Sequence, residues 1–384
     1  MSGIIIYSYL EQMVEQQASD LYITVGIEPM MRVENQLHAV DGHKLTVDMV
    51  QDMLSEVLTS RQRREYETNM ELNLALDMGV NGRFRVNVLR QKQFPALVIR
   101  RITSEIPSFE ELNLPDIFQK LALKKRGLIL ISGVTSSGKS TSLASMVDYR
   151  NQNTPGHIIT IEDPVEYAHE HKSSIITQRE VGIDTQSYHI ALKNALRQKP
   201  DVILVGEIRD AEVMEQALSA AETGHLCMST IHTNNAIQAI ERIINMFPEE
   251  RHNQVRIALS MNLTAIIGQR LVPNKYGGMT PALEILLNEA LIKELILKGE
   301  TGKIRDVMAN NVASGMKLFD ESLFELYAGD YISEDTAIAE ADIQSDMKMR
   351  IQQFNLSGGA VSRGEGSGAS EAGFEQVDTS KLSL

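Results

Sequence analysis

The chain has 384 residues, of which 43% are hydrophobic, and a formal net charge of −14 at pH 7. At roughly one domain per 150 residues this length predicts two or three domains, and the negative charge argues against a nucleic-acid partner, which needs a basic stripe. The single cysteine, Cys227, excludes an intrachain disulfide, and no apolar run approaches the ~18 residues of a membrane-spanning helix.

Residues 1–103 predict a small α+β domain. ASDLYITVGIEPMMRVENQLHAV (18–40) predicts strands around turns, and LTVDMVQDMLSEVLTSRQRREYE (45–67) predicts one helix with apolar positions at helical spacing. Two further strands, RFRVNVLRQ and ALVIRRI, follow. The charged, Pro-punctuated segment after them predicts a linker over residues 104–120.

From residue 121 to 356 the pattern predicts a larger α/β domain. The apolar runs GLILISG, HIITIED, DVILVGE and HLCMSTIHT alternate with helical stretches. Strands without polar alternation are buried on both faces, which is typical of a parallel sheet covered by helices. Residues 236–356 are expected to be mostly helical, and the Gly/Ser-rich residues 357–384 to form a flexible tail.

One loop in this domain carries a phosphate-binding motif. Residues 133–140, GVTSSGKS, fit G-x-x-x-x-G-K-[ST] between a predicted strand and a predicted helix. Backbone amides of such a loop cradle phosphate oxygens, while the lysine reaches the β- and γ-phosphates and the serine hydroxyl joins Mg²⁺. The motif therefore predicts a nucleoside triphosphate and Mg²⁺ at this loop, with Ser140 as a Mg²⁺ ligand. The predicted nucleotide-binding residues of the loop are Gly133, Thr135, Ser136, Ser137, Gly138, Lys139, Ser140 and Thr141.

The other buried strands end in residues that suit hydrolysis of a bound nucleotide. HIITI is followed by Glu162, DVILVG by Glu207 and CMSTI by His232. In open α/β sheets ligands bind at the carboxyl ends of the strands, so adjacent strands would bring these residues to Lys139. A carboxylate there can hold Mg²⁺ or accept a proton from the attacking water, and Glu207 is the second predicted Mg²⁺ ligand. The alternative is that each residue only caps a strand end.

A basic strand precedes this domain. In RFRVNVLRQ, Arg83 and Arg85 alternate with apolar residues, so guanidinium groups share one face. Between Asn81 and Arg101 there are six basic residues and no acidic one. Either this is a solvated strand face, or the arginines stabilise the charge on a transferring phosphoryl group, in cis or from a neighbouring subunit.

The motifs resemble those of a known family. GVTSSGKST, IITIEDPVEY, ALRQKPDVILVGEIRD and TGHLCMSTIHTNNA are similar to the Walker A, Asp box, Walker B and His box of secretion ATPases. More closely, residues 5–355 resemble the PilT/PilU family of type IV pilus twitching-motility ATPases. The resemblance implies a PAS-like first domain, a RecA-like P-loop ATPase domain with a mainly parallel sheet, and a hexameric ring with nucleotides between the two domains.

The resemblance also implies residue roles. Glu162 and Glu166 fall in the Asp box, Glu207 in Walker B, and His225 and His232 in the His box, where His225 would help to bind nucleotide. Arg83, Arg85 and Arg100 occupy the strands whose arginines reach the phosphates in this family. Two positions are notable: Ser136 stands where the family often has glycine, and Gly206 stands where ordinary P-loop enzymes carry aspartate.

Within the family, the sequence resembles the PilU branch. The helix that reads AIRNLIR in PilT is ALIKELI (290–296) here, and QREVGIDT, HLC and the extended tail also resemble PilU. The expected function is that of a cytoplasmic, hexameric ATPase at the inner-membrane pilus base. It would power pilus retraction together with a PilT-like motor and a membrane platform protein, without spanning the membrane itself.

Three other functions are weighed against this one. The chain could be a self-sufficient PilT-like retraction motor. It could instead be a nucleotide-binding scaffold of the motor complex with weak hydrolysis. A RecA-like DNA motor is disfavoured by the net charge of −14.

Overall fold

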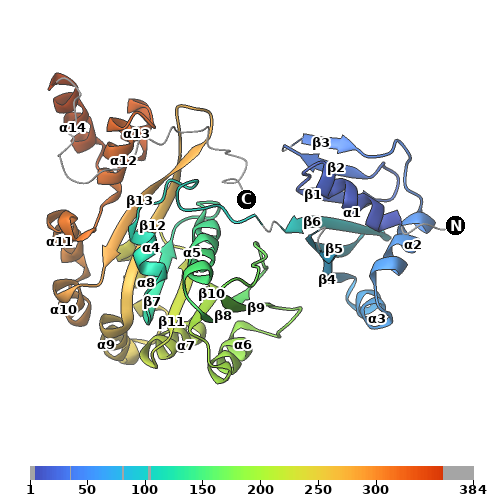
Figure 1. The fold of residues 1–384 in the computed structure, drawn as a ribbon, viewed down its shortest axis with the longest axis horizontal. Helices are drawn as coiled ribbons and strands as arrows, with labels where there is room; N and C mark the ends of the chain where they lie inside the picture. The colour runs from blue at the N-terminus through green and yellow to red at the C-terminus, as the bar shows by residue number, and fades with distance from the viewer. Residues whose placement is uncertain (1–4, 35, 80–81, 103–104, 358–384) are drawn as a thin grey trace. The chain divides into compact units, whose positions relative to one another are not determined.

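The chain forms two compact units in the computed structural model, which describes residues 5–34, 36–79, 82–102 and 105–357 (Figure 1). The first unit comprises Met1–Glu105 with the short segments Pro164–Glu170 and Glu180–Gln186. The second comprises Ile106–Asp163, His171–Arg179 and Ser187–Leu384. The expected tail lies, from residue 358 onward, outside the described residues.

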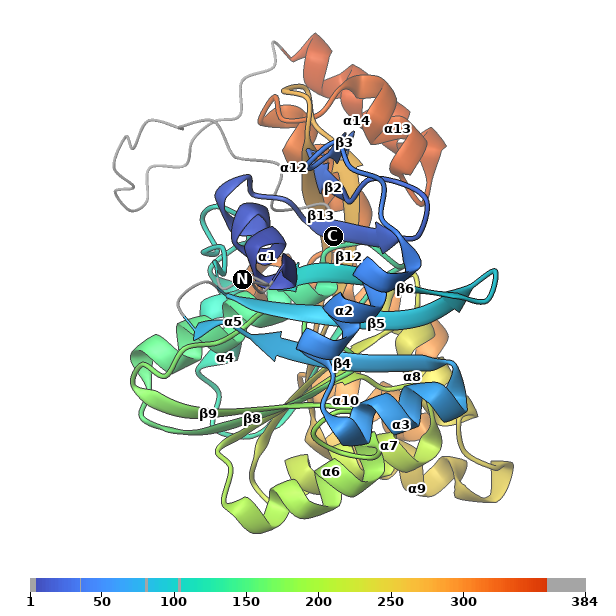
Figure 2. The same ribbon diagram turned by 90° about the vertical axis from the view of Figure 1, so that its right-hand side faces the viewer.

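The first unit is an antiparallel sheet with helices, as expected for a small α+β domain. Its six strands have the order β3-β2-β1-β6-β5-β4 and can be followed in Figure 2. The strands and helices are β1 (Asp20–Thr24), β2 (Met30–Val33), β3 (Gln36–Ala39), β4 (Glu71–Asp77), β5 (Arg83–Gln91), β6 (Phe94–Ile102), α1 (Ile5–Glu15), α2 (Val47–Val57) and α3 (Ser60–Asn69). On β5, Phe84, Val86 and Val88 are buried in the core, whereas Arg83 and Arg85 alternate with them and are half-buried.

The prediction of a single helix over residues 45–67 is wrong, because the helix is interrupted between α2 and α3. Thr59 has an extended backbone and caps α3: its Oγ1 accepts the Gln62 N–H at 3.3 Å. The Gln62 Oε1 in turn accepts the Thr59 N–H at 3.0 Å. This reciprocal capping box satisfies N–H groups that a new helix start leaves open, worth about 1 kcal/mol, so two helices form.

The second unit is built on a seven-stranded sheet with the order β13-β12-β7-β11-β10-β8-β9. Strands β12, β7, β11, β10 and β8 pair in parallel, and β13 pairs antiparallel with β12. The strands are β7 (Gly127–Ser132), β8 (Gly156–Glu162), β9 (Ser174–Glu180), β10 (Val202–Glu207), β11 (Leu226–Ile231), β12 (Leu263–Pro273) and β13 (Met279–Leu287). The predicted α/β class with a mainly parallel sheet is confirmed.

Helices surround this sheet and continue to the end of the described chain. They are α4 (Ile117–Ala122), α5 (Lys139–Asn153), α6 (Tyr188–Ala195), α7 (Ala211–Glu222), α8 (Ala236–Asn245), α9 (His252–Asn262), α10 (Ala290–Lys298), α11 (Ile304–Asn310), α12 (Phe319–Ala328), α13 (Glu334–Glu340) and α14 (Gln344–Leu356), with short 3₁₀ turns η2 (Leu196–Gln198), η3 (Glu249–Arg251), η4 (Thr301–Lys303) and η5 (Val312–Ser314). Within the described ranges, no helix has both the length and the apolar character needed to cross a membrane.

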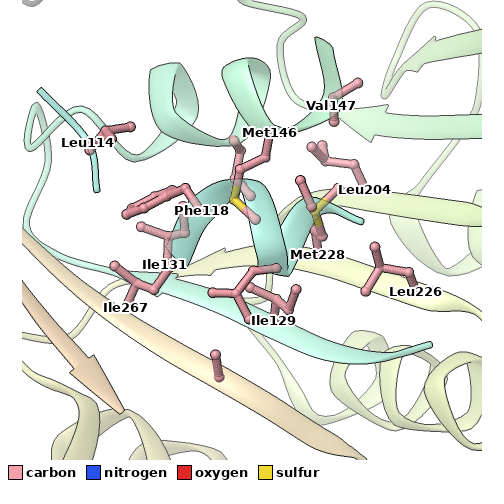
Figure 3. Close-up of a cluster of buried hydrophobic side chains, with 14 of the residues drawn as sticks. Leu114, Phe118, Ile129, Ile131, Met146, Val147, Leu204, Leu226, Met228 and Ile267 are labelled. Atoms are coloured by element: carbon pink, nitrogen blue, oxygen red, sulfur yellow. The ribbon is translucent and has the colours of Figure 1, made fainter. Parts of the chain in front are cut away.

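The sheet is covered on both faces, as the unbroken apolar strands require. Figure 3 shows Ile129 and Ile131 of β7 together with Phe118 of α4 and Met146 of α5 in one buried cluster. The alternate residues of β7 point to the opposite face of the sheet and are also buried, since all six residues of this strand are buried. Packed side chains on both faces of the sheet therefore hold β7 in place, and with it the start of the P-loop.

Two parts of the second unit differ from the sequence expectation. The region expected to be mostly helical contains the long hairpin of β12 and β13, with eleven and nine residues. In addition, Phe109, Leu112 and Leu114, from the segment expected to be a linker, are buried in the cluster of Figure 3. Both segments therefore contribute to the core that supports the sheet.

The hairpin carries a buried acid, Glu284 on β13, whose side chain is only 2% exposed. Its Oε2 accepts the N–H of Ala236, the first residue of α8, at 2.6 Å. Burial raises the pKa of Glu284 from 4.5 to about 7, against the opposing effects of this hydrogen bond and of Arg270 and Arg305. Glu284 therefore fixes the start of α8 and is partly protonated near neutral pH.

We expect Glu284→Gln to stabilise the protein above pH 7 but not below pH 5. Because the pKa is raised on folding, the stability that protonated Glu284 contributes is complete below pH 4.5 and is lost as the pH rises through 7. Glutamine stays neutral and can still accept the Ala236 N–H, so the gain at pH 8 should be at most roughly 3 kcal/mol. Melting temperatures between pH 5 and 8 test this, with the exposed Glu340→Gln as control. A pH-independent difference would contradict the raised pKa.

Candidate active site

The loop between β7 and α5 has two positions that require glycine. A Cβ atom at Gly133 would lie 2.3 Å from Ser137 Oγ and 2.5 Å from the carbonyl oxygen of Gln269. Gly138 has a left-handed backbone with φ 80°, and a Cβ there would lie 2.8 Å from Gln269 Nε2. The loop is therefore folded tightly against β12, with a glycine at each end.

Ser136 also has a left-handed backbone, with φ 62°. A residue with a side chain pays about 1–2 kcal/mol in this conformation, which glycine adopts freely. This strain gives a physical reason for the glycine that the resemblance leads one to expect at this position. The serine keeps the loop geometry at a small cost in stability.

The lysine and one serine of the loop point to a bound anion. Lys139 is only 7% exposed, and its Nζ donates to the carbonyl oxygen of Val134 at 2.6 Å. The Oγ of Ser137 is buried and has no hydrogen-bond partner among the described residues. A buried hydroxyl without a partner costs about 1–3 kcal/mol. Phosphate oxygens in this loop would give the hydroxyl a partner and the ammonium group a counter-charge.

The strands that precede the predicted site residues are adjacent and parallel, in the order β7-β11-β10-β8 (Figure 1). Glu162 is the last residue of β8, Glu207 is the last residue of β10, and His232 directly follows β11. Lys139 begins α5 after β7. The carboxyl ends of these strands meet at one edge, which is the arrangement that the sequence prediction requires.

Glu207 is the centre of the charged groups at this edge. Its Oε2 accepts a hydrogen bond from Arg209 Nε at 2.7 Å, and its Oε1 lies 3.3 Å from His232 Nε2. Burial and the nearby Lys139 lower the pKa of His232, whereas Glu207 acts in the opposite direction. The structure therefore brings Lys139, Glu207 and His232 together and favours a neutral imidazole at pH 7.

Glu162 is oriented by its own neighbours. Its Oε1 accepts hydrogen bonds from Thr160 Oγ1 at 2.6 Å and from Gln178 Nε2 at 3.2 Å. Arg209 also extends toward this strand, with its Nη1 3.8 Å from Asp163 Oδ2. Both predicted carboxylates are thus held in place at the edge that carries the P-loop.

His225 is not brought to the P-loop. It directly precedes β11, so the whole of Leu226–Ile231 separates it from His232, roughly 20 Å at 3.3 Å per residue. Its Nδ1 lies 3.1 Å from the carbonyl oxygen of Ala220 and 3.1 Å from Thr223 Oγ1. Within this chain, His225 stands at the opposite edge of the sheet from the nucleotide loop.

The predicted arginines lie on the first unit, in a row across four adjacent strands. Arg32, Asp20, Arg100 and Arg85 face each other in register on β2, β1, β6 and β5. Arg100 Nε donates to Asp20 Oδ1 at 2.9 Å, and Arg32 Nε lies 3.7 Å from Asp20 Oδ2. We call these four residues the arginine row. Arg83 is two residues from Arg85 on the same face of β5.

Two residues with clear roles near the loop were missed from the sequence. Gln269 on β12 accepts a hydrogen bond from Ser142 Oγ on α5 at 2.8 Å. It also lies against both ends of the P-loop, with its carbonyl oxygen beside Gly133 and its Nε2 beside Gly138. Gln178 holds Glu162. Gln269 lies on β12, which was not predicted, and Gln178 begins QREVGIDT, a motif to which no chemical role was assigned.

Comparisons with known proteins identify the family of the chain. The family described as Type II/IV secretion system protein matches residues 3–289. The type IV pilus ATPase PilU of Pseudomonas aeruginosa is 47% identical over 344 residues, covering 89% of this chain and 90% of that protein. The type IV pilus retraction ATPase PilT of the same organism is 38% identical over 329 residues, covering 86% and 96%.

A solved structure shows the same fold. The crystal structure of the pilus retraction motor PilT with bound ADP superimposes with a TM-score of 0.83 and 40% sequence identity, covering 90% of this chain and 99% of that one. The family match, these relatives and the P-loop geometry agree on a nucleotide-binding enzyme. The chain therefore belongs to the type II/IV secretion ATPases, among the type IV pilus motor ATPases of the PilT/PilU family, and is an ATP hydrolase.

Proposed function

We propose that this chain is a PilU-type accessory ATPase that works with a PilT-like motor to retract type IV pili. It would act as a homo-hexamer at the cytoplasmic face of the inner membrane, against a pilus platform protein. The observation that carries the proposal is the convergence of Lys139, Glu162, Glu207 and His232 at one sheet edge, in a chain 47% identical to a PilU over most of its length.

The proposed site residues divide the work of hydrolysis. The P-loop residues 133–141 hold the phosphates through backbone amides, and Lys139 neutralises the β- and γ-phosphates. Glu162 and Glu207 are placed to orient the attacking water and accept its proton. The neutral imidazole of His232 can hydrogen-bond the γ-phosphate region and so distinguish ATP from ADP.

The residues present fit Mg²⁺ bound through the nucleotide. Among the described residues no cluster of three or more His, Cys, Asp or Glu side chains could hold a metal by itself. Mg²⁺ commonly takes only one or two protein oxygens together with phosphate oxygens and waters. Ser140 Oγ and the Glu207 carboxylate would supply these oxygens, and the bound ion would neutralise charge on the phosphates.

The arginine row supports a role in binding anions. Guanidinium groups directly opposite each other, as at Arg85 and Arg100, are unfavourable, and a single carboxylate, Asp20, serves both Arg32 and Arg100. The row therefore has a net positive charge in a protein of net charge −14. A phosphate group would offset this charge, and in a ring it could belong to a neighbouring subunit's nucleotide.

Arg85→Ala should reduce ATP turnover strongly while ATP affinity falls much less. A positioned arginine is worth about 10³-fold or more in phosphoryl transfer, whereas the P-loop amides and Lys139 would still bind the nucleotide. Steady-state hydrolysis and nucleotide affinity are measured for Arg85→Ala and for Arg90→Ala, a control on the same strand outside the row. Wild-type turnover in Arg85→Ala would mean that the row is only a solvated strand face.

The accessory role is tested in cells that retain a PilT-like motor. Deleting this gene should weaken or abolish retraction, and the wild-type gene should restore it. Restoration by the inactive Lys139→Ala variant would instead favour the scaffold. Retraction by this chain in cells without the PilT-like motor would favour a self-sufficient motor.

A further inference from the structure

The glycine in the Walker B motif faces a tyrosine. Ordinary P-loop enzymes carry an aspartate at the position of Gly206, where its carboxylate helps to hold Mg²⁺. Here, a Cβ atom at Gly206 would lie 3.0 Å from the hydroxyl oxygen of Tyr188 and 3.3 Å from Glu162 Cα. The space into which an aspartate side chain would extend is thus occupied by the Tyr188 hydroxyl.

Tyr188 is fixed in this place by its helix. It is the first residue of α6, whose start is capped by Ser187: the Ser187 Oγ accepts the Ile190 N–H at 3.2 Å. Among the described residues no hydrogen bond engages the Tyr188 hydroxyl. This group is therefore held at the catalytic edge with its donor and its acceptor available.

The surroundings of the hydroxyl are the site residues themselves. Asp163, Glu162 and Glu207 lie close enough to act on it electrostatically, as does Arg209. Burial, and then the charges of these carboxylates, hold the pKa of Tyr188 above its usual value. The hydroxyl consequently keeps its proton and can donate a hydrogen bond as well as accept one.

We propose that Tyr188 is a positioning residue for ATP hydrolysis, whose hydroxyl takes the place of the missing Walker B carboxylate and orders water between Glu162 and Glu207. A hydroxyl can donate to a carboxylate and accept from the same water that the carboxylate binds. A second carboxylate at this point would instead repel the charge of Glu207. The proposal rests on the ATPase activity of the chain and adds a residue that its motifs do not name.

Tyr188→Phe removes only the hydroxyl oxygen and tests the proposal. We expect kcat to fall about 10- to 100-fold, at or below the lower end of the range for a lost hydrogen-bond donor in the transition state, because the hydroxyl acts through a water. KM for ATP and the affinity for a non-hydrolysable ATP analogue should stay within about twofold of wild type, because the P-loop is untouched. The melting temperature should stay within a few degrees of wild type. The control is Tyr149→Phe on α5. This variant loses a hydrogen bond of 3.3 Å from the Tyr149 hydroxyl to Gln119 Oε1, which does not involve the site residues, and it should keep the wild-type kcat.

A double-mutant cycle with Gly206→Ala tests the link between the two positions. The added methyl group would displace the Tyr188 hydroxyl, so Gly206→Ala alone should also lower kcat. In the Tyr188→Phe background its effect should be smaller than in wild type, because only the contact of the methyl group with the backbone of Glu162 and Ile161 then remains. Losses of kcat that add up in the double mutant would overturn the proposal. A wild-type kcat in Tyr188→Phe would also overturn it. So would a lower kcat in Tyr188→Phe that is explained by a lower melting temperature, since the hydroxyl would then serve only stability. Lys139→Ala is measured beside these variants. If it is inactive while one of these contradicting results is found, the proposed ATPase function stands and only the role of Tyr188 fails.

Discussion

Lys139→Ala is expected to abolish ATP hydrolysis while leaving the second unit folded. Lys139 is the buried cation of the P-loop, at the edge where Glu207 and His232 also lie. Removing a positioned charge that stabilises a transferring phosphoryl group costs at least ~10³-fold in turnover. The strand β7 and helix α5 are held by apolar packing on both faces of the sheet, which the substitution does not touch.

Phosphate release and the melting temperature are measured together for this variant. The control is Lys348→Ala, an exposed lysine on α14 that should change neither. Hydrolysis at the wild-type rate in Lys139→Ala would show that the P-loop is not the site of catalysis. A lost thermal transition would show that the lysine is needed for folding, and Lys139→Met, which keeps the apolar stem, then separates the two effects.

Glu207→Gln is expected to bind ATP with nearly wild-type affinity but to turn it over about 10²- to 10⁴-fold more slowly. Glutamine has the same size and one oxygen, so it can still contact Arg209 or His232, the two neighbours of the carboxylate. It has no negative charge with which to take a proton from water. The exposed Glu222→Gln on α7 is the matched control and should hydrolyse ATP normally.

The same variant reports on the assembly. If hydrolysis is coupled between subunits of a ring, as proposed, Glu207→Gln chains mixed with wild type should reduce activity by more than their share of the chains. Steady-state hydrolysis is measured over a series of mixing ratios. A strictly proportional decrease would contradict coupling between subunits, although it would leave the catalytic role of Glu207 intact.

The sequence allows the P-loop and the strand-end residues to be predicted because each lies in a short continuous pattern. A buried apolar run followed by Glu162, Glu207 or His232 identifies both the strand and the residue at its carboxyl end. Parallel pairing of adjacent strands then brings these ends together. In the first unit, the alternation along β5 in the same way predicted which face carries Arg83 and Arg85.

The hairpin of β12 and β13 was missed because its pattern is ambiguous. LTAIIGQRLVP contains an apolar run that could belong to a helix, interrupted by Gln269 and Arg270, and it follows α9 without a clear break. Pairing with β7 makes it a strand, and that is a tertiary interaction. Residues whose role depends on such long-range contacts, Gln269 and Tyr188, could not be found from local patterns.

His225 shows the limit of reading a motif as a unit. The sequence HLCMSTIH begins with His225 and ends with His232, and the resemblance assigns both histidines to one box. A strand of six residues separates the two, so its ends lie at opposite edges of the sheet. Because a strand was predicted between the two histidines, the sequence already placed His225 at its start and His232 at its end.

Retraction of single pili shows whether ATP hydrolysis by this chain drives movement of the pilus. Cells that retain the PilT-like motor carry either the wild-type gene or the Glu207→Gln variant, at equal protein levels, and retraction force is recorded. Cells with the variant should retract pili weakly or not at all, because ATP hydrolysis at this edge of the sheet powers the contribution of the chain. Retraction with wild-type force in the Glu207→Gln cells would contradict it.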